Sequence, residues 1–350
     1  MKENIQKIIE AGRLSPSADN SQPWFFTVEE NAIYVHHDVE HTAANHLYNI
    51  DFFADYVSLG AVIENMHVQA HHLGYTPEIN FFESAHPIAK IELKKTHDPY
   101  SSDLLDSLAK RKTNRRAYST KKIARDIKNK LQALAEAKGA HLCWIEDPQI
   151  IKQFSRIIGI HDYILWGDKA LRDNLLRMVS FEKNEQAVVG LPLESLELGL
   201  KKHFFKPTIY LAEKIKLLWK VMGVGSVIHT SQNVKRSGAL AFITYSKDHH
   251  PHTYLGGGRA MQAIWLYLTT KNIFMQPLFG TLCLILNQRL SRGGLSPKYQ
   301  RIQNEIADFF HATFPNLKNE TPVALFRLGY AKGPSAVSGR KAIEKIMKNV

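Results

Sequence analysis

The sequence predicts an α+β protein whose two halves each combine strands with a long buried helix. Residues 56–73 and 254–268 are apolar nearly all round, and such helices are usually enclosed by other layers. Each of these helices follows an apolar run that predicts a strand. The motif Tyr56-x-x-x-Gly60 aligns with Tyr254-x-x-x-Gly258, so the halves are predicted to be distant copies of one unit.

The remaining elements follow from apolar periodicity and from glycine, which often ends a helix. Gly12 and Gly74 are placed to end the first short helix and the long helix at 56–73. In chain order we expect strands at 25–28 and 32–36, one or two strands within 77–93, a helix at 123–137, a strand at 141–145, helices at 150–158 and 171–181, and strands at 237–245 and 323–330. Residues 188–224 fit no simple layer and could form a lid, a dimer contact or an insertion packed on the core.

Charge and composition limit the classes of partner. Forty-five basic residues exceed 33 acidic ones, a balance that suits nucleic acid, an anionic membrane or a phosphate-bearing ligand. The basic residues are scattered and form no zinc-finger, RNP or Walker A motif, so no nucleic-acid partner is expected. No apolar run approaches the ~20 residues that span a bilayer. Cys143 and Cys283 lie far apart and no secretory signal is expected, which favours a cytoplasmic location.

One helix carries three residues of types that bind metals. Glu64, His67 and His71 fall at i, i+3 and i+7 within 56–73. The H-E-x-x-H order of metalloenzymes is absent and no further ligand is evident. We therefore expect polar residues on a partly buried helix and no metal.

The loop Ser15-Pro-Ser-Ala-Asp-Asn-Ser-Gln-Pro-Trp24 is rich in small and polar residues, which allow a backbone to approach a ligand closely. The amides of Asn20 and Gln22 offer both donors and acceptors, and could match a ring edge that carries N–H and C=O groups. The alternative is an ordinary helix end, an Asx turn and a strand start.

Three further segments could reach the same ligand. Arg111-Lys-Thr-Asn-Arg115 carries two guanidinium groups, which bind phosphate through charge-assisted forks, although a solvated basic turn explains it equally well. Gln276-Pro-Leu-Phe-Gly280 follows the second long helix and could be a simple helix-to-strand turn. Arg340 follows the last predicted strand.

Together these segments resemble the nitroreductase family of flavoproteins. The loop is similar to the family's P-S-x-x-N-x-Q-P-W segment, and R-K-T-N-R is similar to its R-R-S-x-R signature, with Thr113 in place of serine. The resemblance implies a nitroreductase-like fold, in which helices flank a central, mostly antiparallel sheet, and a site for flavin mononucleotide (FMN). The implied FMN contacts are Pro16, Ser17, Asn20, Gln22, Arg111, Lys112, Thr113, Arg115, Pro277, Leu278, Phe279, Gly280 and Arg340. A backbone N–H of Phe279 or Gly280 would face flavin N5.

The motifs are divided between two unequal half-copies, residues 1–105 and 106–350, with a lid-like insertion around 188–224. Together they supply a single set of flavin contacts. This resembles the fused, Acg-like subgroup and implies an intramolecular pseudo-dimer with one FMN, either as a monomer or as a homodimer.

The function implied is reduction of a small acceptor, such as a nitro compound or a quinone, with electrons from NAD(P)H. The flavin carries this chemistry, so no catalytic protein residue is expected. The alternative is a non-catalytic protein that stores or sequesters FMN beneath residues 188–224.

Overall fold

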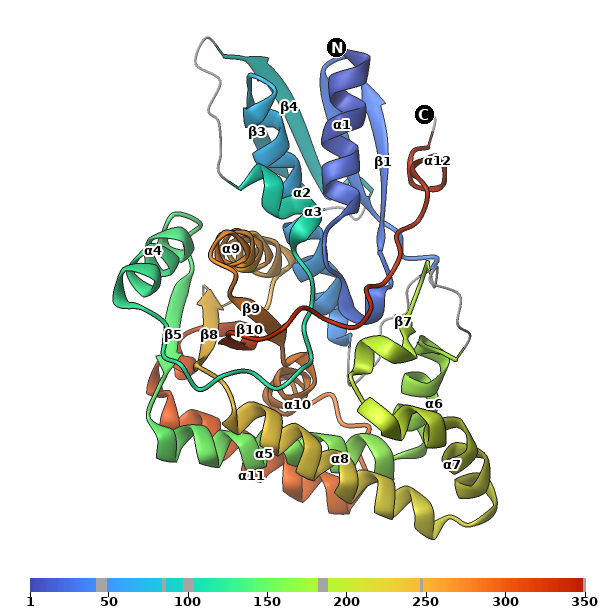
Figure 1. Ribbon diagram of the computed structural model, residues 1–350. Helices are drawn as coiled ribbons and strands as arrows, with labels where there is room; N and C mark the ends of the chain where they lie inside the picture. The colour runs from blue at the N-terminus through green and yellow to red at the C-terminus, as the bar shows by residue number, and fades with distance from the viewer. Residues whose placement is uncertain (42–48, 84–85, 97–103, 182–187, 246–247, 349–350) are drawn as a thin grey trace.

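The computed structural model describes residues 1–41, 49–83, 86–96, 104–181, 188–245 and 248–348. Two four-stranded antiparallel sheets organise the chain, and helices lie on and between them (Figure 1). The α+β class with antiparallel sheets is therefore confirmed.

The first unit holds residues up to β4. Its elements are α1 (Lys2–Arg13), β1 (Trp24–Glu29), β2 (Ala32–His37), α2 (Phe53–His72), β3 (Tyr75–Phe81) and β4 (Ala89–Lys95). The strands lie in the order β1-β2-β4-β3. Helix α1 buries Ile5, Ile8 and Ile9 on one face, as the sequence pattern predicts.

The second unit repeats this plan. Its corresponding elements are α4 (Arg125–Glu136), β5 (His141–Ile145), β8 (Ala239–Tyr245), α9 (Pro251–Thr270), β9 (Phe274–Pro277) and β10 (Thr321–Gly329). The order β5-β8-β10-β9 is the order of the first sheet once each strand is matched to its counterpart. Both units thus follow the sequence helix, strand, strand, helix, strand, strand.

The second unit carries additional elements between these. Between β5 and β8 lie α5 (Pro148–Gly167), α6 (Lys169–Met178), β6 (Val179–Ser180), β7 (Leu191–Pro192), α7 (Lys202–Lys214) and α8 (Leu217–Lys235). Between β9 and β10 lie α10 (Phe279–Arg289) and α11 (Pro297–Thr313). The short helices are α3 (Leu105–Lys110), α12 (Ile343–Ile346) and the 3-10 turns at Ala18–Asn20, Ile50–Phe52, Leu193–Leu196, Gly199–Lys201 and Pro315–Lys318.

Helices α2 and α9 cross at two glycines. A Cβ on Gly60 would collide with the carbonyl oxygen of Leu255, and a Cβ on Gly258 would collide with that of Val57. Val57 and Leu255 occupy equivalent positions of the two aligned stretches. The crossing is therefore reciprocal, and each glycine allows the opposing backbone to approach.

The same two helices connect the hydrophobic cores. Leu255 of α9 is fully buried in the first unit's core, together with Trp24 and Leu59. Phe53 and Val57 of α2 lie in the second unit's core. Because each helix buries apolar side chains in the other unit, the two units stabilise one another.

Some of the buried polar groups along this helix pair are matched. Gln262 Nε2 donates a hydrogen bond to Asn65 Oδ1 at 2.6 Å. Glu64, considered above as a metal ligand, forms ion pairs with Lys138 at 2.8 Å and Arg259 at 3.0 Å. Burial alone would raise the pKa of Glu64, but the two cations lower it below its usual value.

The C-terminal segment returns to the first unit. Residue Met347 forms a parallel bridge with Phe26 of β1, and Lys348 donates its backbone N–H to the Phe26 carbonyl at 2.9 Å. This segment, drawn in dark red, crosses the face of both units in Figure 1. It carries Arg340 toward the loop that follows α1.

The predicted strands and long helices are confirmed, and most ends differ by a few residues. The helix expected at 150–158 is longer than predicted, because α5 continues to Gly167. Helices α7, α8, α10 and α11 were not predicted. Residues 188–224 contain β7, α7 and the first part of α8. Among the helices of the described ranges, none combines the length and apolar character needed to cross a bilayer.

Candidate functional site

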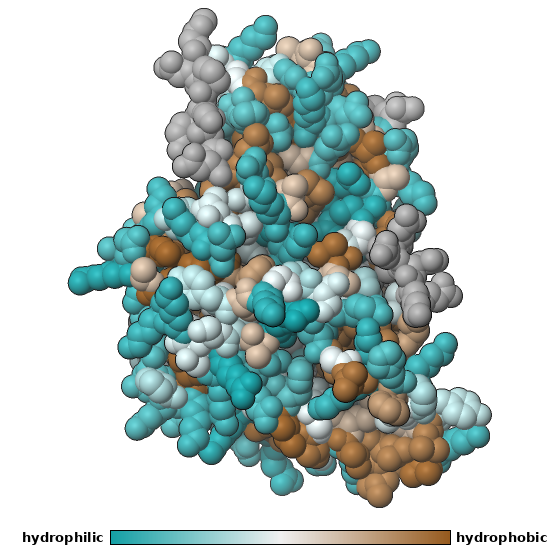
Figure 2. Space-filling view, in the orientation of Figure 1, coloured by the Kyte–Doolittle hydropathy of each residue, from teal (hydrophilic) through white to brown (hydrophobic). Residues whose placement is uncertain are grey.

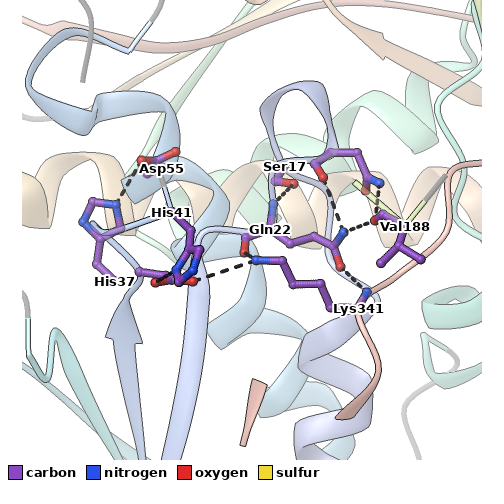
Figure 3. Close-up of polar contacts among 9 residues, drawn as sticks. Ser17, Gln22, His37, His41, Asp55, Val188 and Lys341 are labelled. Carbon is purple, nitrogen blue, oxygen red and sulfur yellow. Dashed lines mark hydrogen bonds and ion pairs between the residues drawn. The ribbon is translucent and has the colours of Figure 1, made fainter. Parts of the chain in front are cut away.

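The loop after α1 is fixed by Gln22, which is fully buried. Gln22 donates its backbone N–H to Ser17 Oγ at 2.9 Å and its side-chain N–H to the Val188 carbonyl at 2.5 Å. Its Oε1 accepts the backbone N–H of Lys341 at 2.7 Å (Figure 3). Gln22 therefore connects the loop, the segment before β7 and the C-terminal segment.

The backbone of this loop is unusual at Asp19, Asn20 and Gln22, whose φ values are 48°, 56° and 54°. Asp and Asn tolerate the left-handed region better than other residues with a Cβ, because their short polar side chains bond locally. The resulting turn exposes Pro16, Ser17 and Asp19 to two adjoining cavities.

The segment Arg111–Arg115 runs beside β9. Thr113 forms a parallel bridge with Met275. Asn114 is buried, donates to the Lys332 carbonyl at 2.8 Å and accepts the backbone N–H of Arg116 at 3.0 Å. Since β9 ends at Pro277, this pairing brings Thr113 and Arg115 next to the turn that begins α10.

The first cavity, of about 260 Å³, is largely apolar. Helix α2 contributes Val57, and α9 contributes Met261 and Trp265. The remaining walls include the α1 loop, the Pro277–Gly280 turn and helices α5 and α6. Both units therefore line it, at the crossing of their long helices.

The second cavity, of about 250 Å³, is basic. Arg111, Lys112, Arg115 and Arg340 line it, together with Asn20. The two cavities share Pro16, Ser17, Asp19, Thr113 and Arg115 as common walls. They therefore form one elongated site with an apolar end and a cationic end.

Three guanidinium groups crowd the cationic end. Burial and the neighbouring Arg340 lower the pKa of Arg111 to about 9, and burial and Arg13 lower that of Arg340 to about 10. Burial also lowers the pKa of Arg115, although Asp19 opposes this. Within the described ranges, none of the three forms an ion pair with a carboxylate.

Backbone and side-chain amide oxygens accept hydrogen bonds from some of the N–H groups of these arginines. Arg111 donates to the Leu14 carbonyl at 3.2 Å and lies 4.5 Å above the Trp265 ring. Arg340 donates to Asn20 Oδ1 at 2.8 Å. The Nε atoms of Arg111 and Arg340 are buried and have no hydrogen-bond partner among the residues that the structure describes. Clustered, desolvated cations of this kind are typical of an anion-binding site.

A histidine faces the opposite, apolar end. His161 of α5 contacts Gly280, where any side chain would collide with the imidazole ring. Its Nδ1 lies 3.2 Å from Asp162 Oδ1. Burial would raise the pKa of Asp162, but hydrogen bonds from His161, Thr230 and Ser226 lower it. The carboxylate therefore holds the ring orientation.

All but two of the predicted site residues line one or both of the two cavities. Pro16, Ser17, Thr113 and Arg115 line both cavities, Pro277, Phe279 and Gly280 line the apolar one, and Asn20, Arg111, Lys112 and Arg340 line the basic one. Gln22 and Leu278 line neither cavity; Leu278 is buried and donates its backbone N–H to Leu325.

Sequence reasoning did not identify Asp19, His161 or Trp265 as site residues. No motif marks them apart from the His161-Asp162 dipeptide. The Asp19 side chain is exposed to the cavities, and enclosure by their walls raises its pKa more than Arg115 lowers it.

The 188–224 segment touches the site only at its start. Leu191 and Ser195 line the basic cavity, and the Val188 carbonyl accepts from Asn20 at 3.1 Å. Helix α7 contributes no lining residue, and the outer wall of the apolar cavity comes from α5 and α6. The lid role of 188–224 stays a prediction.

Comparison with known proteins gives remote likenesses. A family model described as a putative TM nitroreductase matches residues 1–61. The uncharacterized protein MT1398 of Mycobacterium tuberculosis (strain CDC 1551 / Oshkosh) is 24% identical over 339 residues, 95% of this chain and 47% of that protein. The chain thus spans about half the length of the curated relative it matches.

Solved structures are similar at low identity. Oxidized iodotyrosine deiodinase bound to FMN and 3-iodo-L-tyrosine is 14% identical with a TM-score of 0.37, covering 68% of this chain and 95% of that one. The FMN-dependent nitroreductase NfnB from Mycobacterium smegmatis, in complex with NADPH, is 12% identical with a TM-score of 0.35, covering 70% and 97%.

Proposed function

We propose that this chain is an FMN-dependent oxidoreductase of the nitroreductase type, which reduces a small acceptor, such as a nitro compound or a quinone, with electrons from NADH or NADPH. One observation carries the proposal. The buried guanidinium group of Arg111 and the half-buried ones of Arg115 and Arg340 have no carboxylate ion-pair partner among the described residues. They adjoin an apolar cavity at the place where the loop, R-K-T-N-R and Pro277–Gly280 segments meet. The matched family model also includes the loop.

The residues present fit FMN at both ends of the site. A phosphate dianion would neutralise the repulsion between Arg111 and Arg340, and would give their unpartnered Nε atoms an acceptor. Thr113 would add a hydroxyl donor. The apolar cavity, with Met261 and Trp265 on one side, suits a flat ring system.

Bound FMN would supply acceptance of hydride from a nicotinamide and its delivery to a second substrate. The chain's own residues would bind FMN and orient it. The α1 loop and the turn at Phe279 and Gly280 line the apolar end of the site, where the FMN ring would bind, and α5 and α6 supply further walls there. His161, held by Asp162, is placed to give a proton to an acceptor as it is reduced.

A single chain is sufficient for one site, because the loop of the first unit and the arginines of the second meet within it. We therefore propose an intramolecular pseudo-dimer, with half-copies at 1–105 and 106–350 and one FMN, acting as a monomer or a homodimer. We further propose a cytoplasmic enzyme that does not act on nucleic acid.

The test is stopped-flow absorbance of the FMN-loaded protein. We expect the oxidised flavin bands to bleach with NADH or NADPH and to recover when a quinone or nitroaromatic compound is added. Tight FMN binding without bleaching by either nucleotide would favour the storage protein instead. A protein that binds no FMN would refute both functions.

A further inference from the structure

The outer face of the α7–α8 hairpin is apolar. Phe204 and Leu211 lie on one stripe of α7, and Ile215 comes directly after the last residue of that helix. Leu217, Val221, Val224 and Ile228 follow one stripe of α8 at i, i+4, i+7 and i+11. We call these seven residues the docking face. All are exposed, from 46% for Leu211 to 70% for Phe204. They gather in the brown region at the lower right of Figure 2.

The inner face of the hairpin already holds it to the molecule. Trp219 of α8 is buried, stacks on Trp166 of α5 at 6.0 Å and receives the Arg172 guanidinium at 4.3 Å. Ala212 of α7 is fully buried in the same cluster. The docking face is therefore not needed for folding, and its exposure requires another explanation.

Lysines surround the docking face. Residues 200–228 contain Lys201, Lys202, Lys206, Lys214, Lys216 and Lys220, against a single acidic residue, Glu213. Over the part of the chain that the structure describes, none of these lysines forms an ion pair. Apolar side chains between unpaired lysines are typical of helices that lie in the headgroup region of anionic lipids.

We propose that the docking face binds the surface of an anionic lipid bilayer, with α7 and α8 lying in the plane of the interface. This inference stands independently of the proposed function. A second copy of the chain is a poorer partner, because a symmetric contact would bring two lysine-rich faces together. The face projects from the corner of the molecule opposite both termini (Figure 1), where a flat surface can reach it.

The docking face is connected to the candidate site through α6. Leu175 of α6 lines the apolar cavity and also packs against the cluster that holds Trp166 and Trp219. Helix α6 therefore contacts both the cavity and the cluster beneath the docking face.

The experiment is flotation of the purified chain with vesicles of phosphatidylcholine alone and of phosphatidylcholine mixed with phosphatidylglycerol. We expect binding to the mixed vesicles that weakens with salt, and little binding to the neutral ones. The triple variant Lys214→Gln, Lys216→Gln, Lys220→Gln should bind roughly 100-fold more weakly. The triple variant Leu217→Gln, Val221→Gln, Val224→Gln should also lose binding.

A matched control distinguishes the effect of the docking face from the effect of the protein's overall positive charge. Lys122→Gln, Lys130→Gln, Lys152→Gln removes the same charge from exposed positions outside the hairpin, and should leave binding nearly unchanged. Circular dichroism checks that each variant keeps its helices. Absence of binding to mixed vesicles, an equal loss in the control, or self-association in place of vesicle binding would each overturn the proposal.

Discussion

The two units share one plan but differ in what they add to it. Both place a long helix over a four-stranded sheet of the same strand order, and each helix buries residues in the other unit's core. Glu30 and Asn31 alone separate β1 from β2 in the first unit, whereas four helices separate β5 from β8 in the second.

The two units therefore contribute different chemical groups to the candidate site. The first unit contributes a loop, residues 15–22, that contains no cation and supplies small groups and amides. The second contributes Arg111, Arg115 and the wall with His161, while the C-terminal segment carries Arg340 back to the loop. The shared helix pair holds the units together, and the unshared parts give the site its charge and its walls.

The double variant Arg111→Ala, Arg115→Ala tests most strongly whether the second unit supplies the cationic end of the site. Each substitution removes charge-assisted hydrogen bonds to the proposed FMN phosphate, worth about 1.5–3 kcal/mol apiece. We expect FMN affinity to fall by roughly 10²- to 10⁴-fold in a fluorescence titration. The variant Arg125→Ala, Arg301→Ala removes two exposed arginines and should bind normally; equal affinities for the two variants would contradict the phosphate placement.

His161→Gln tests the wall that the second unit adds. Loss of the proposed proton donor should slow reoxidation of reduced FMN by a quinone roughly 10²-fold, while bleaching by the nicotinamide nucleotide is unchanged. Stopped-flow absorbance separates these two half-reactions. His72→Gln, at an exposed position of α2, is the control. Equal slowing of both half-reactions would assign His161 to cofactor positioning.

Lowering the pH should destabilise the folded protein at the α2–α9 helix pair, because His67 of α2 is then protonated. Burial lowers the pKa of His67 to about 4, with Glu64 opposing the shift, so the folded protein keeps this ring neutral where the unfolded chain protonates it near pH 6.5. Stability is therefore lost as pH falls from about 6.5 to 4, by roughly 1–3 kcal/mol.

Urea unfolding against pH measures this effect. His67→Gln should flatten the dependence in that window, and His72→Gln should not. The interpretation fails if the slopes of the two variants agree.

Gly60→Ala and Gly258→Ala test the reciprocity of the crossing. Each new methyl group meets the opposing backbone, so each variant should lose roughly 1–3 kcal/mol of unfolding free energy, by similar amounts. The double variant should cost less than the sum, because one substitution already separates the helices. Gly225→Ala is the control, since its Cβ meets nothing within 4 Å. Very unequal single effects would show that the crossing is not symmetric.

The sequence predicted most of the shared plan. Helices α2 and α9 and strands β8 and β10 are long apolar runs, which leave little ambiguity. The site motifs were also found, because each is a string of unusual residues. The strand order could not be predicted, since pairing depends on contacts between distant segments.

The elements that the sequence did not predict lack a clear periodic pattern of apolar residues. Helix α10 is apolar nearly all round and begins at Phe279, inside a segment that reads as a turn. Helix α8 is apolar on both its buried and its exposed face, so no amphipathic pattern marks it. Asp19 occupies a position that the P-S-x-x-N pattern of the loop leaves open, and His161 and Trp265 reach the site through tertiary packing.

We infer that the two units build one FMN site in a single chain. Titration of the FMN-free protein with FMN, followed by fluorescence and isothermal calorimetry, tests it most directly. One FMN per chain is predicted, with Asn20→Ala of the first unit and Arg115→Ala of the second each weakening the same binding event. Two FMN per chain, or binding that is insensitive to either substitution, would contradict the account.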